Sequence, residues 1–195
     1  GPETRSSFMM MSFHSGGAGA RPHQDGLSAT PYPSGVRNVP VEITEAITPL
    51  VVWQKEYREN SGGPGRQRGG LGQTMVVANR EDGPFGIFAT FERVHFPPRG
   101  RDGGGDGAKG RLSLTSGDVL RNKGFQPIPK GERLIVEMPG GGGYGDPKTR
   151  DPETVVADVR AGFIDRAAAE SEYGVVVGEG FDVDQSRTDS LRGWD

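Results

Sequence analysis

Apolar residues fall in short runs along this 195-residue chain, and turns rich in glycine and proline separate the runs. Runs of about four to eight apolar and β-branched residues between such turns are typical of strands. The pattern predicts strands over residues 8–13, 50–57, 74–78, 85–94, 111–114, 134–138 and 175–177. Residues 41–47 fit a short helix or a strand equally, because their apolar positions follow neither period well.

Two of these runs carry further expectations. Residues 8–13 are apolar on both faces, which predicts a strand buried on both sides and a chain prone to aggregate without a covering layer. In residues 50–57, Val51, Trp53 and Tyr57 share one face and polar side chains occupy the other. One side of that strand should therefore face solvent.

The end of the chain predicts a pair of capped helices. Asp151 is placed as the N-cap of a helix over residues 152–161, with Pro152 at its first position and Gly162 at its end. Asp165 caps a second helix that ends at Tyr173, before Gly174. The fold class is therefore α+β and mainly β, with short strands, Gly/Pro-rich loops and a C-terminal helical hairpin.

We divide the chain into a β-rich domain over residues 1–147, a helical hairpin with a final strand over 148–177, and a polar tail over 178–195. The tail has room for a last helical turn, with Trp194 docked on a partner. Four consecutive glycines at positions 140–143 join a strand to a capped helix, which predicts a tight backbone crossing rather than a flexible linker. Residues 102–109 are expected to form an exposed glycine-rich turn.

Composition limits the classes of function that this chain can have. The 33 glycines and 15 prolines make up about a quarter of the chain, so we expect a folded domain that depends on a partner. A net charge of −3 is not the strongly basic charge that is typical of a nucleic-acid-binding protein. No apolar run approaches the length of a membrane span. The absence of cysteine excludes disulfides and thiol catalysis within the chain and is compatible with a cytoplasmic location.

Candidate metal ligands are few. His23 and Asp25 could point to one side of an extended segment, but two ligands are too few for a metal site, and His14 and His95 lie in other segments. A turn formed by Asp25 and the glycine after it is the alternative. We therefore predict no metal site in this chain and identify no catalytic residue.

Two glycine-rich loops resemble phosphate-binding loops by composition only. Residues 61–72 lack the Gly-Lys-Ser/Thr ending of a phosphate loop, and residues 140–145 do not close a dinucleotide-binding unit. A structural hairpin or subunit contact is the favoured interpretation of residues 61–72. The chain alone should have no affinity for ATP.

The loop between Pro33 and Pro40 is the best ligand-facing segment. Its polar residues are Ser34, Arg37 and Asn38. Arg37 could bind a carboxylate or carbonyl oxygen, and the alternative is a structural ion pair with Glu42. No Ser in this region has the surroundings of a nucleophile.

Several glycine-rich motifs of this chain occur together in one known family. They are GGAGARP at residues 16–22 with DGLSA at 25–29, PSGVRNVPVE at 33–42, SGGPGR at 61–66 with RGGLG at 68–72, RVHFPPRG at 93–100, and PGGGGYGDP at 139–147 with the helix pair. In this order and over roughly residues 14–177, the chain resembles the carboxyl-terminal end of the hydantoinase B family, also called the N-methylhydantoinase B or oxoprolinase large-subunit family.

This resemblance implies ATP-dependent opening of a cyclic amide, such as a hydantoin, 5-oxoproline or a lactam. It implies as partners the remainder of the hydantoinase B-type subunit, a hydantoinase A-type subunit that handles ATP, and a small-molecule substrate. ATP and a divalent metal are expected in those partner chains. Arg21, Asp25, Ser34, Arg37 and Asn38 are our candidates for an active-site wall. The alternatives are a subunit of an ATP-dependent ketone carboxylase and a non-catalytic assembly module.

Overall fold

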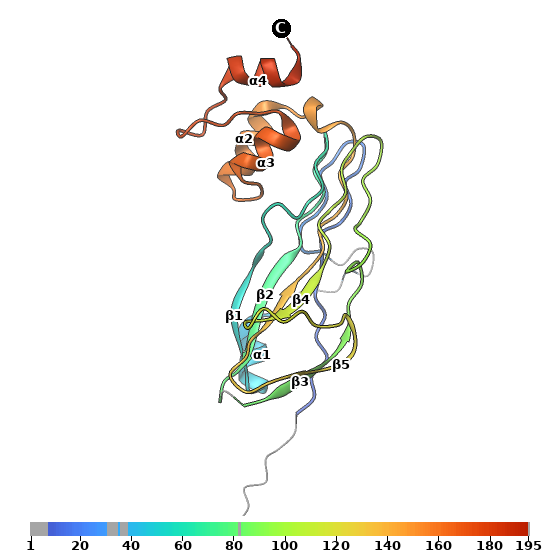
Figure 1. The fold of residues 1–195 in the computed structure, drawn as a ribbon, viewed down its shortest axis with the longest axis vertical. Helices are drawn as coiled ribbons and strands as arrows, with labels where there is room; N and C mark the ends of the chain where they lie inside the picture. The colour runs from blue at the N-terminus through green and yellow to red at the C-terminus, as the bar shows by residue number, and fades with distance from the viewer. Residues whose placement is uncertain (1–7, 31–34, 36–38, 82, 195) are drawn as a thin grey trace, which may run out of the picture.

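The strands, with one short helix beside them, and the C-terminal helices lie at opposite ends of the molecule in the computed structural model, and long glycine-rich segments run between them (Figure 1). The structure describes residues 8–30, 35, 39–81 and 83–194. The predicted class, α+β with a helical C-terminal part, is confirmed.

A four-stranded antiparallel sheet forms the larger part of the strand end. Its order is β1 (Leu50–Tyr57), β2 (Gln73–Asn79), β6 (Leu134–Glu137) and β4 (Arg111–Leu114). A bulge between Val52 and Gln54 interrupts the pairing of β1 with β2. The bulge breaks the simple alternation of faces that the sequence predicts for β1.

A second sheet pairs β3 (Phe85–Thr90) with β5 (Lys123–Ile128), and a short helix, α1 (Val41–Ile47), lies beside β1. The apolar core of this end forms between the two sheets. Its buried members are Met75, Leu114, Ile128, Leu134, Val136 and Met138.

The helical end begins with a 3-10 turn, η1 (Pro147–Thr149), followed by α2 (Pro152–Arg160), α3 (Arg166–Tyr173) and α4 (Gln185–Arg192). Asp151 caps α2 by accepting a hydrogen bond from the amide of Glu153 (3.1 Å), and Asp165 caps α3 by accepting one from the amide of Ala168 (2.7 Å). Within the described residues, no helix is long and apolar enough to cross a membrane.

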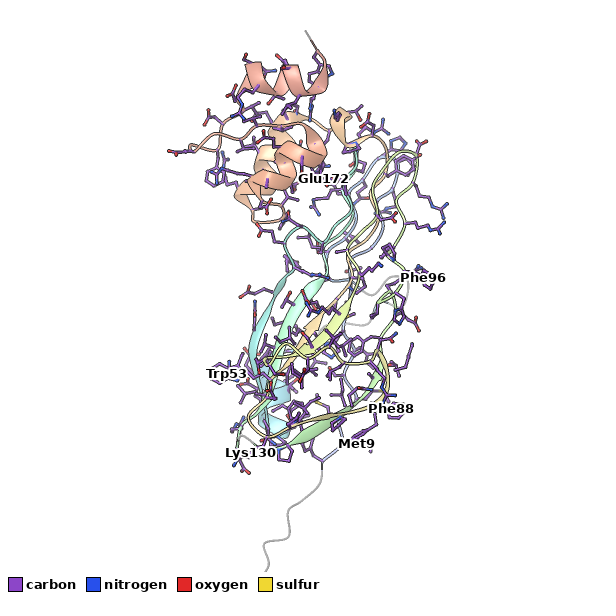
Figure 2. The ribbon with its side chains drawn as sticks, viewed as in Figure 1. Met9, Trp53, Phe88, Phe96, Lys130 and Glu172 are labelled. Atoms are coloured by element: carbon purple, nitrogen blue, oxygen red, sulfur yellow. The ribbon has the colours of Figure 1, made fainter. Side chains whose placement is uncertain are left out.

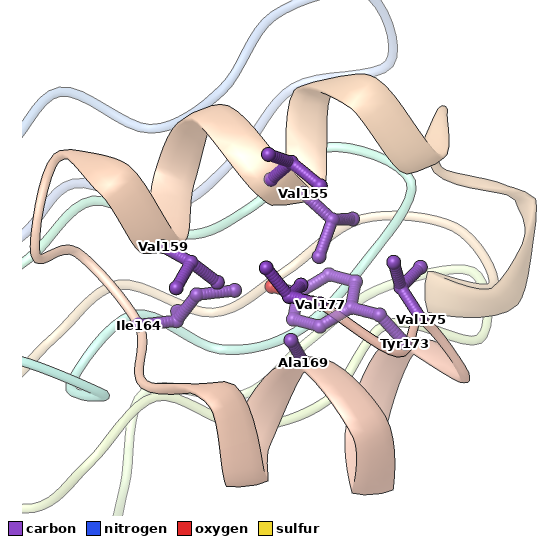
Figure 3. Close-up of a cluster of buried hydrophobic side chains, with 8 residues drawn as sticks. Val155, Val159, Ile164, Ala169, Tyr173, Val175 and Val177 are labelled. Carbon is purple, nitrogen blue, oxygen red and sulfur yellow. The ribbon is translucent and has the colours of Figure 1, made fainter. Parts of the chain in front are cut away.

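The helical end has a hydrophobic core of its own (Figure 3). Tyr173 is only 1 % exposed and lies across its centre, between the side chains of α2 and those of the segment after α3. The buried members are Val155, Val156, Val159, Ile164, Ala169, Tyr173, Val175 and Val177. Each end of the molecule is therefore a small separate core.

The prediction of a buried strand over residues 8–13 is wrong. Among the described residues this segment pairs with no strand, and Met9 and Met11 are 100 % and 81 % exposed. An apolar pattern shows that a segment needs covering, but it does not show whether the cover comes from the same chain.

Other element predictions were wrong for local reasons. Residues 175–177 are buried in the helical core and form only a single bridge, between Val177 and Val183. The strand predicted over 85–94 ends at Thr90, and Arg93 takes a positive φ of 60°. The sequence pattern missed β5, because Gly124 and Pro127 interrupt it. Proline is tolerated there because β5 has only one neighbouring strand.

Replacing Asp151 with alanine tests the cap of α2. Loss of the acceptor for the Glu153 amide should cost about 1 kcal/mol of unfolding free energy, or roughly 2–4 °C in a chain of this size. Thermal melting followed by circular dichroism measures the shift. Asp151→Asn, which keeps an acceptor, is the matched control and should melt close to the native chain; equal melting of Asp151→Ala would contradict the capping role.

Candidate functional site

The glycine-rich segments between the two ends form one backbone bundle, which we call the glycine bundle. It consists of residues 16–20, 61–72, 98–108 and 139–145. The segment 139–145 lies at its centre, because it exchanges backbone hydrogen bonds with each of the other three. The sequence predicts an exposed turn over residues 102–109. Residues 102 and 103 form such a turn and are exposed, but residues 102–108 belong to the bundle and Gly107 is buried.

Hydrogen bonds of the central segment repeat every three residues. The amides of Gly140 and Gly143 donate to residues 108 and 105 of one neighbour (3.1 and 2.9 Å). The amides of Gly141 and Tyr144 donate to residues 70 and 67 of a second (2.8 and 2.9 Å), and the carbonyls of Pro139 and Gly142 accept from residues 17 and 20 of a third (both 2.9 Å). Three residues per turn without internal hydrogen bonds is the period of polyproline II.

Side chains would not fit in this arrangement. A Cβ built on Gly140 would lie 1.7 Å from the carbonyl oxygen of Ser61, and one on Gly142 would lie 2.2 Å from that of Arg99. Of the residues 140–145, only Gly145 has a positive φ, 76°. The four glycines are therefore needed for close backbone approach and not for an unusual turn, as the tight crossing predicted from the sequence requires.

The same hydrogen bonds decide what the loop 61–72 can bind. The amides of Gly63, Gly69 and Gly70 all donate to backbone carbonyls within the chain, at 2.8–2.9 Å. A phosphate loop needs amides that are free to point at the anion. This geometry favours the structural hairpin over a phosphate site.

A charged cluster connects the bundle to the helical end. Arg150, just before α2, donates from both terminal nitrogens to the two oxygens of Asp25 (2.8 Å each) and from Nη2 to Asp158 Oδ2 (2.8 Å). Arg68, in the bundle, donates from Nε to the same Asp158 oxygen (3.2 Å). The two arginines and two aspartates balance in charge, as buried ions require.

Burial strengthens the interactions among the charged side chains of this cluster. Arg150 and Asp158 are 3 % and 9 % exposed at their side chains, and Asp25 is 32 % exposed. Burial alone would raise the pKa of Asp25, but the hydrogen bonds and charge of Arg150 hold it below its usual range. Burial alone would lower the pKa of Arg150, but Asp25 and Asp158 raise it, so this guanidinium stays charged.

Tyr173 lies close to the cluster, although its hydroxyl has no hydrogen-bond partner among the residues that the structure describes. Burial raises its pKa above the usual value. The neutral phenol therefore persists at all physiological pH values.

Two of the residues predicted for an active-site wall lie near one end of the bundle. Arg21 and Gln24 close a turn through two backbone hydrogen bonds, and the exposed guanidinium of Arg21 donates to Gln24 Oε1 (2.7 Å). Asp25 follows directly, with its carboxylate paired to Arg150. Ser34, Arg37 and Asn38, and with them the proposed ion pair to Glu42, lie outside the described residues.

His23 lies within the Arg21–Gln24 turn, two residues before Asp25, whereas His14 is distant from this site. His14 lies at the strand end, where its Nδ1 is 3.0 Å from the sulfur of Met75 and its ring stacks on Phe91. Burial and the charge of Lys55 lower the pKa of His14 to about 4, so it is neutral at pH 7. Within the part of the chain that the structure describes, no three His, Asp or Glu side chains could hold a metal ion together.

A cleft of about 230 Å³ lies between the bundle and the helical end. Gly62, Asp106 and Ala108 line one side, and Ile164 and Glu172 line the other. Substrate pockets are commonly about 300–1,000 Å³, so this cleft is small for one. The ionisable side chains that line the cleft, Asp106, Glu172 and Tyr173, are all acids.

Sequence reasoning missed Arg68, Arg150 and Asp158 as members of the site. Asp158 carried a signal, because it falls beside Val155 and Val159 on the apolar face of α2. A carboxylate on such a face needs a buried partner. The sequence does not indicate which of the many arginines pairs with Asp158.

Alanine at positions 142 and 143 tests the close approach. The two added Cβ atoms would lie 2.2 and 2.0 Å from backbone oxygens of Arg99 and Pro64, which cannot move aside as a side chain would. Each overpacked position should cost about 3 kcal/mol or more, measured by urea unfolding. Gly19→Ala is the matched control, since its Cβ meets nothing closer than 3.9 Å. If the double variant unfolded like this control, the bundle would not be close-packed.

Asp25→Asn tests the charged cluster. The pKa of Asp25 is lower in the folded than in the unfolded chain, where it is about 4. Its charge therefore stabilises the fold above about pH 4, and this stabilisation is lost as the pH falls through the lower folded pKa. Asp25→Asn should cost about 2 kcal/mol at pH 7, and its gap to the native chain should narrow below about pH 4.

Urea unfolding at a series of pH values measures this gap, with Glu179→Gln, at an exposed position, as the control. A gap that stayed constant from neutral pH to well below pH 4 would show that the carboxylate charge contributes nothing.

This chain is similar in sequence to known proteins. Residues 1–147 match the family model described as Hydantoinase B/oxoprolinase. The chain is 34 % identical over 203 aligned residues to the B-type subunit of a putative D-/L-hydantoinase from Pseudomonas sp. strain NS671, covering 98 % of this chain and 33 % of that protein. The chain thus spans about a third of the length of this relative.

Two solved structures share the fold. The ATP-dependent caprolactamase from Pseudomonas jessenii superposes with a TM-score of 0.76 and 28 % identity, over 92 % of this chain and 33 % of that one. A nucleotide-free acetone carboxylase superposes with a TM-score of 0.69 and 22 % identity, over 92 % of this chain and 29 % of that one. The second likeness shows the fold alone.

Proposed function

The chain belongs to the hydantoinase B/oxoprolinase family, and on that premise we propose that it forms part of an ATP-dependent enzyme that opens a cyclic amide. The identity of 34 % to a hydantoinase B-type subunit over nearly the whole chain carries this proposal. The caprolactamase likeness, at 28 % identity, supports the same reaction class. The ketone carboxylase alternative has support only from a shared fold.

The role of this chain within such an enzyme is to provide a rigid wall. Backbone hydrogen bonds hold the glycine bundle on all sides of its central segment, and the cluster around Arg150 attaches the helical end to it. The exposed Arg21 turn lies where residues 16–20 of the bundle end. We assign Arg21 the binding of a carboxylate or carbonyl oxygen, with Asp25 and Arg150 fixing its turn.

Neither ATP nor a divalent metal fits the residues that the structure describes. In the loop 61–72 the amides of Gly63, Gly69 and Gly70 already donate to backbone carbonyls, and the described His, Asp and Glu side chains form no group of three that could hold a metal ion. We therefore place both groups in the partners, a hydantoinase A-type subunit and the remainder of the hydantoinase B-type subunit. No reaction step is assigned through them.

The complex purified through an affinity tag on this chain provides the test. We expect ATP hydrolysis that depends on a cyclic amide, with hydantoin, 5-oxoproline and caprolactam as the substrates assayed. Arg21→Gln should lower kcat/KM at least about tenfold, as expected for loss of one charged hydrogen bond, with no change in melting temperature. Arg187→Gln, at an exposed position on α4, is the matched control.

Two outcomes would contradict the proposal. ATP turnover that required acetone and bicarbonate, and no cyclic amide, would assign the chain to a carboxylase. Full amide-dependent activity of a complex lacking this chain would show that the chain is not a required part of that enzyme.

A further inference from the structure

The outer face of the β3–β5 sheet is aromatic where a surface sheet is usually polar. Phe88 and Phe125 lie directly opposite each other in the register of the two strands and are 76 % and 60 % exposed. The other face of the same strands carries Ala89 and Ile128, which are 2 % and 0 % exposed and face the core. An antiparallel sheet with one packed face normally exposes polar residues on the other.

The neighbouring backbone makes room for this aromatic pair. The ring of Phe125 lies over Gly86, where a Cβ would come within 2.6 Å of ring carbons. Glycine in a strand interior weakens it, and a close approach explains its presence. The Phe125 ring is thus held flat on the sheet and its outer surface stays open.

Residues 8–13 extend the apolar surface. Met9, Met11 and Phe13 are 100 %, 81 % and 63 % exposed. His14 follows them and stacks on Phe91, the residue after β3, which packs against the core, so this segment leaves the strand end beside the end of β3. In the view of Figure 2, Met9 and Phe88 project on the same side of the strand end, and Trp53 projects on the other side. We call Phe88, Phe125, Met9, Met11 and Phe13 the apolar corner.

The apolar corner calls for an uncharged partner surface. Its nearest charged neighbours along β5 and after β3 are Lys123 and Glu92, which pair with each other. Aromatic side chains offer about 150–250 Å² each, so the corner presents several hundred Å² of apolar area. Patches of that size on soluble proteins mark interaction sites.

The length of the relatives indicates which protein surface covers the apolar corner. The chain covers 33 % of the hydantoinase B-type subunit and 33 % of the caprolactamase chain that it matches. The other two thirds of such a polypeptide lie outside the part that this chain matches and offer a surface to cover this domain. We propose that the apolar corner binds an aliphatic and aromatic surface of the remainder of the hydantoinase B-type subunit. This inference rests on the proposed function for the identity of that partner.

Site-specific crosslinking in the purified complex tests the inference. The photoreactive residue p-benzoylphenylalanine replaces Phe88 in the tagged chain, and mass spectrometry identifies the crosslinked peptide. We expect a peptide from the remainder of the hydantoinase B-type subunit, whether that part is joined to this chain or separate. The same substitution at Ile47, which is 68 % exposed on α1, should give at least tenfold less of that product.

A second pair of variants measures what the corner contributes. In a complex where the subunit remainder is a separate chain, Phe88→Ser with Phe125→Ser should reduce its co-purification at least tenfold while the tagged chain keeps its melting temperature. Ile43→Thr with Ile47→Thr removes exposed apolar groups from α1 and should leave co-purification unchanged. Equal co-purification of both double variants would overturn the inference.

The possible crosslinks separate this inference from the proposed function. A crosslink from position 88 to a second copy of this chain, to a hydantoinase A-type subunit, or to nothing would overturn the docking proposal even when amide-dependent ATP turnover is observed. A crosslink to the hydantoinase B-type remainder in a complex without such turnover would support the docking proposal and contradict the proposed reaction.

Discussion

Close approach of backbones within the glycine bundle is the constraint on which the rest of the molecule depends. A Cβ at Gly141 would lie 1.9 Å from the carbonyl of Ala18, and at Gly69 it would lie 2.0 Å from that of Gly141. Glycine loses more conformational freedom on folding than any other residue. The bundle offsets this cost with hydrogen bonds to three neighbours around a single central segment. Unlike a strand in a two-dimensional sheet, this segment has partners on several sides.

A bundle of this kind has almost no apolar side chains to bury, so its two ends must stabilise it. The strand end supplies one small core and the helical end another. Arg150 links the bundle to the second core by binding Asp25 and Asp158 together. Removing one partner from such a buried group leaves an unpaired charge, which costs more than the pair contributes. The cluster therefore specifies how the helical end sits on the bundle.

Local patterns predicted the parts of the fold that local interactions determine. Asp151 and Asp165 cap their helices as the sequence indicates, and the strand over residues 50–57 is present. Contacts between distant residues escaped prediction. Asp25 and Arg150 are 125 positions apart, and no period in the sequence connects them. Asp25 was selected as a wall residue from its neighbourhood in sequence, without its partner.

The glycine motifs show the same division between what sequence reveals and what it omits. They predict that residues 139–145 form a tight crossing, but the three-residue period of hydrogen bonding appears only when all four segments are together. Residues 8–13 illustrate the opposite case, in which the apolar pattern was clear and the predicted strand was wrong. Their pattern is explained if the covering surface belongs to a partner, as we propose for the apolar corner.

The motifs that identify the family are largely the segments that form the bundle. Residues 16–20, 61–72 and 139–145 carry both the resemblance and the backbone packing. A sequence signature of this origin reports a shared scaffold, because substitution of its glycines is limited by sterics whatever the substrate. The caprolactamase and the acetone carboxylase structures share the fold of this chain, so the same scaffold occurs in an amide hydrolase and in a carboxylase. Under our proposal, differences in reaction come from side chains at the edge of the bundle, such as Arg21, and from the chains that pack against it.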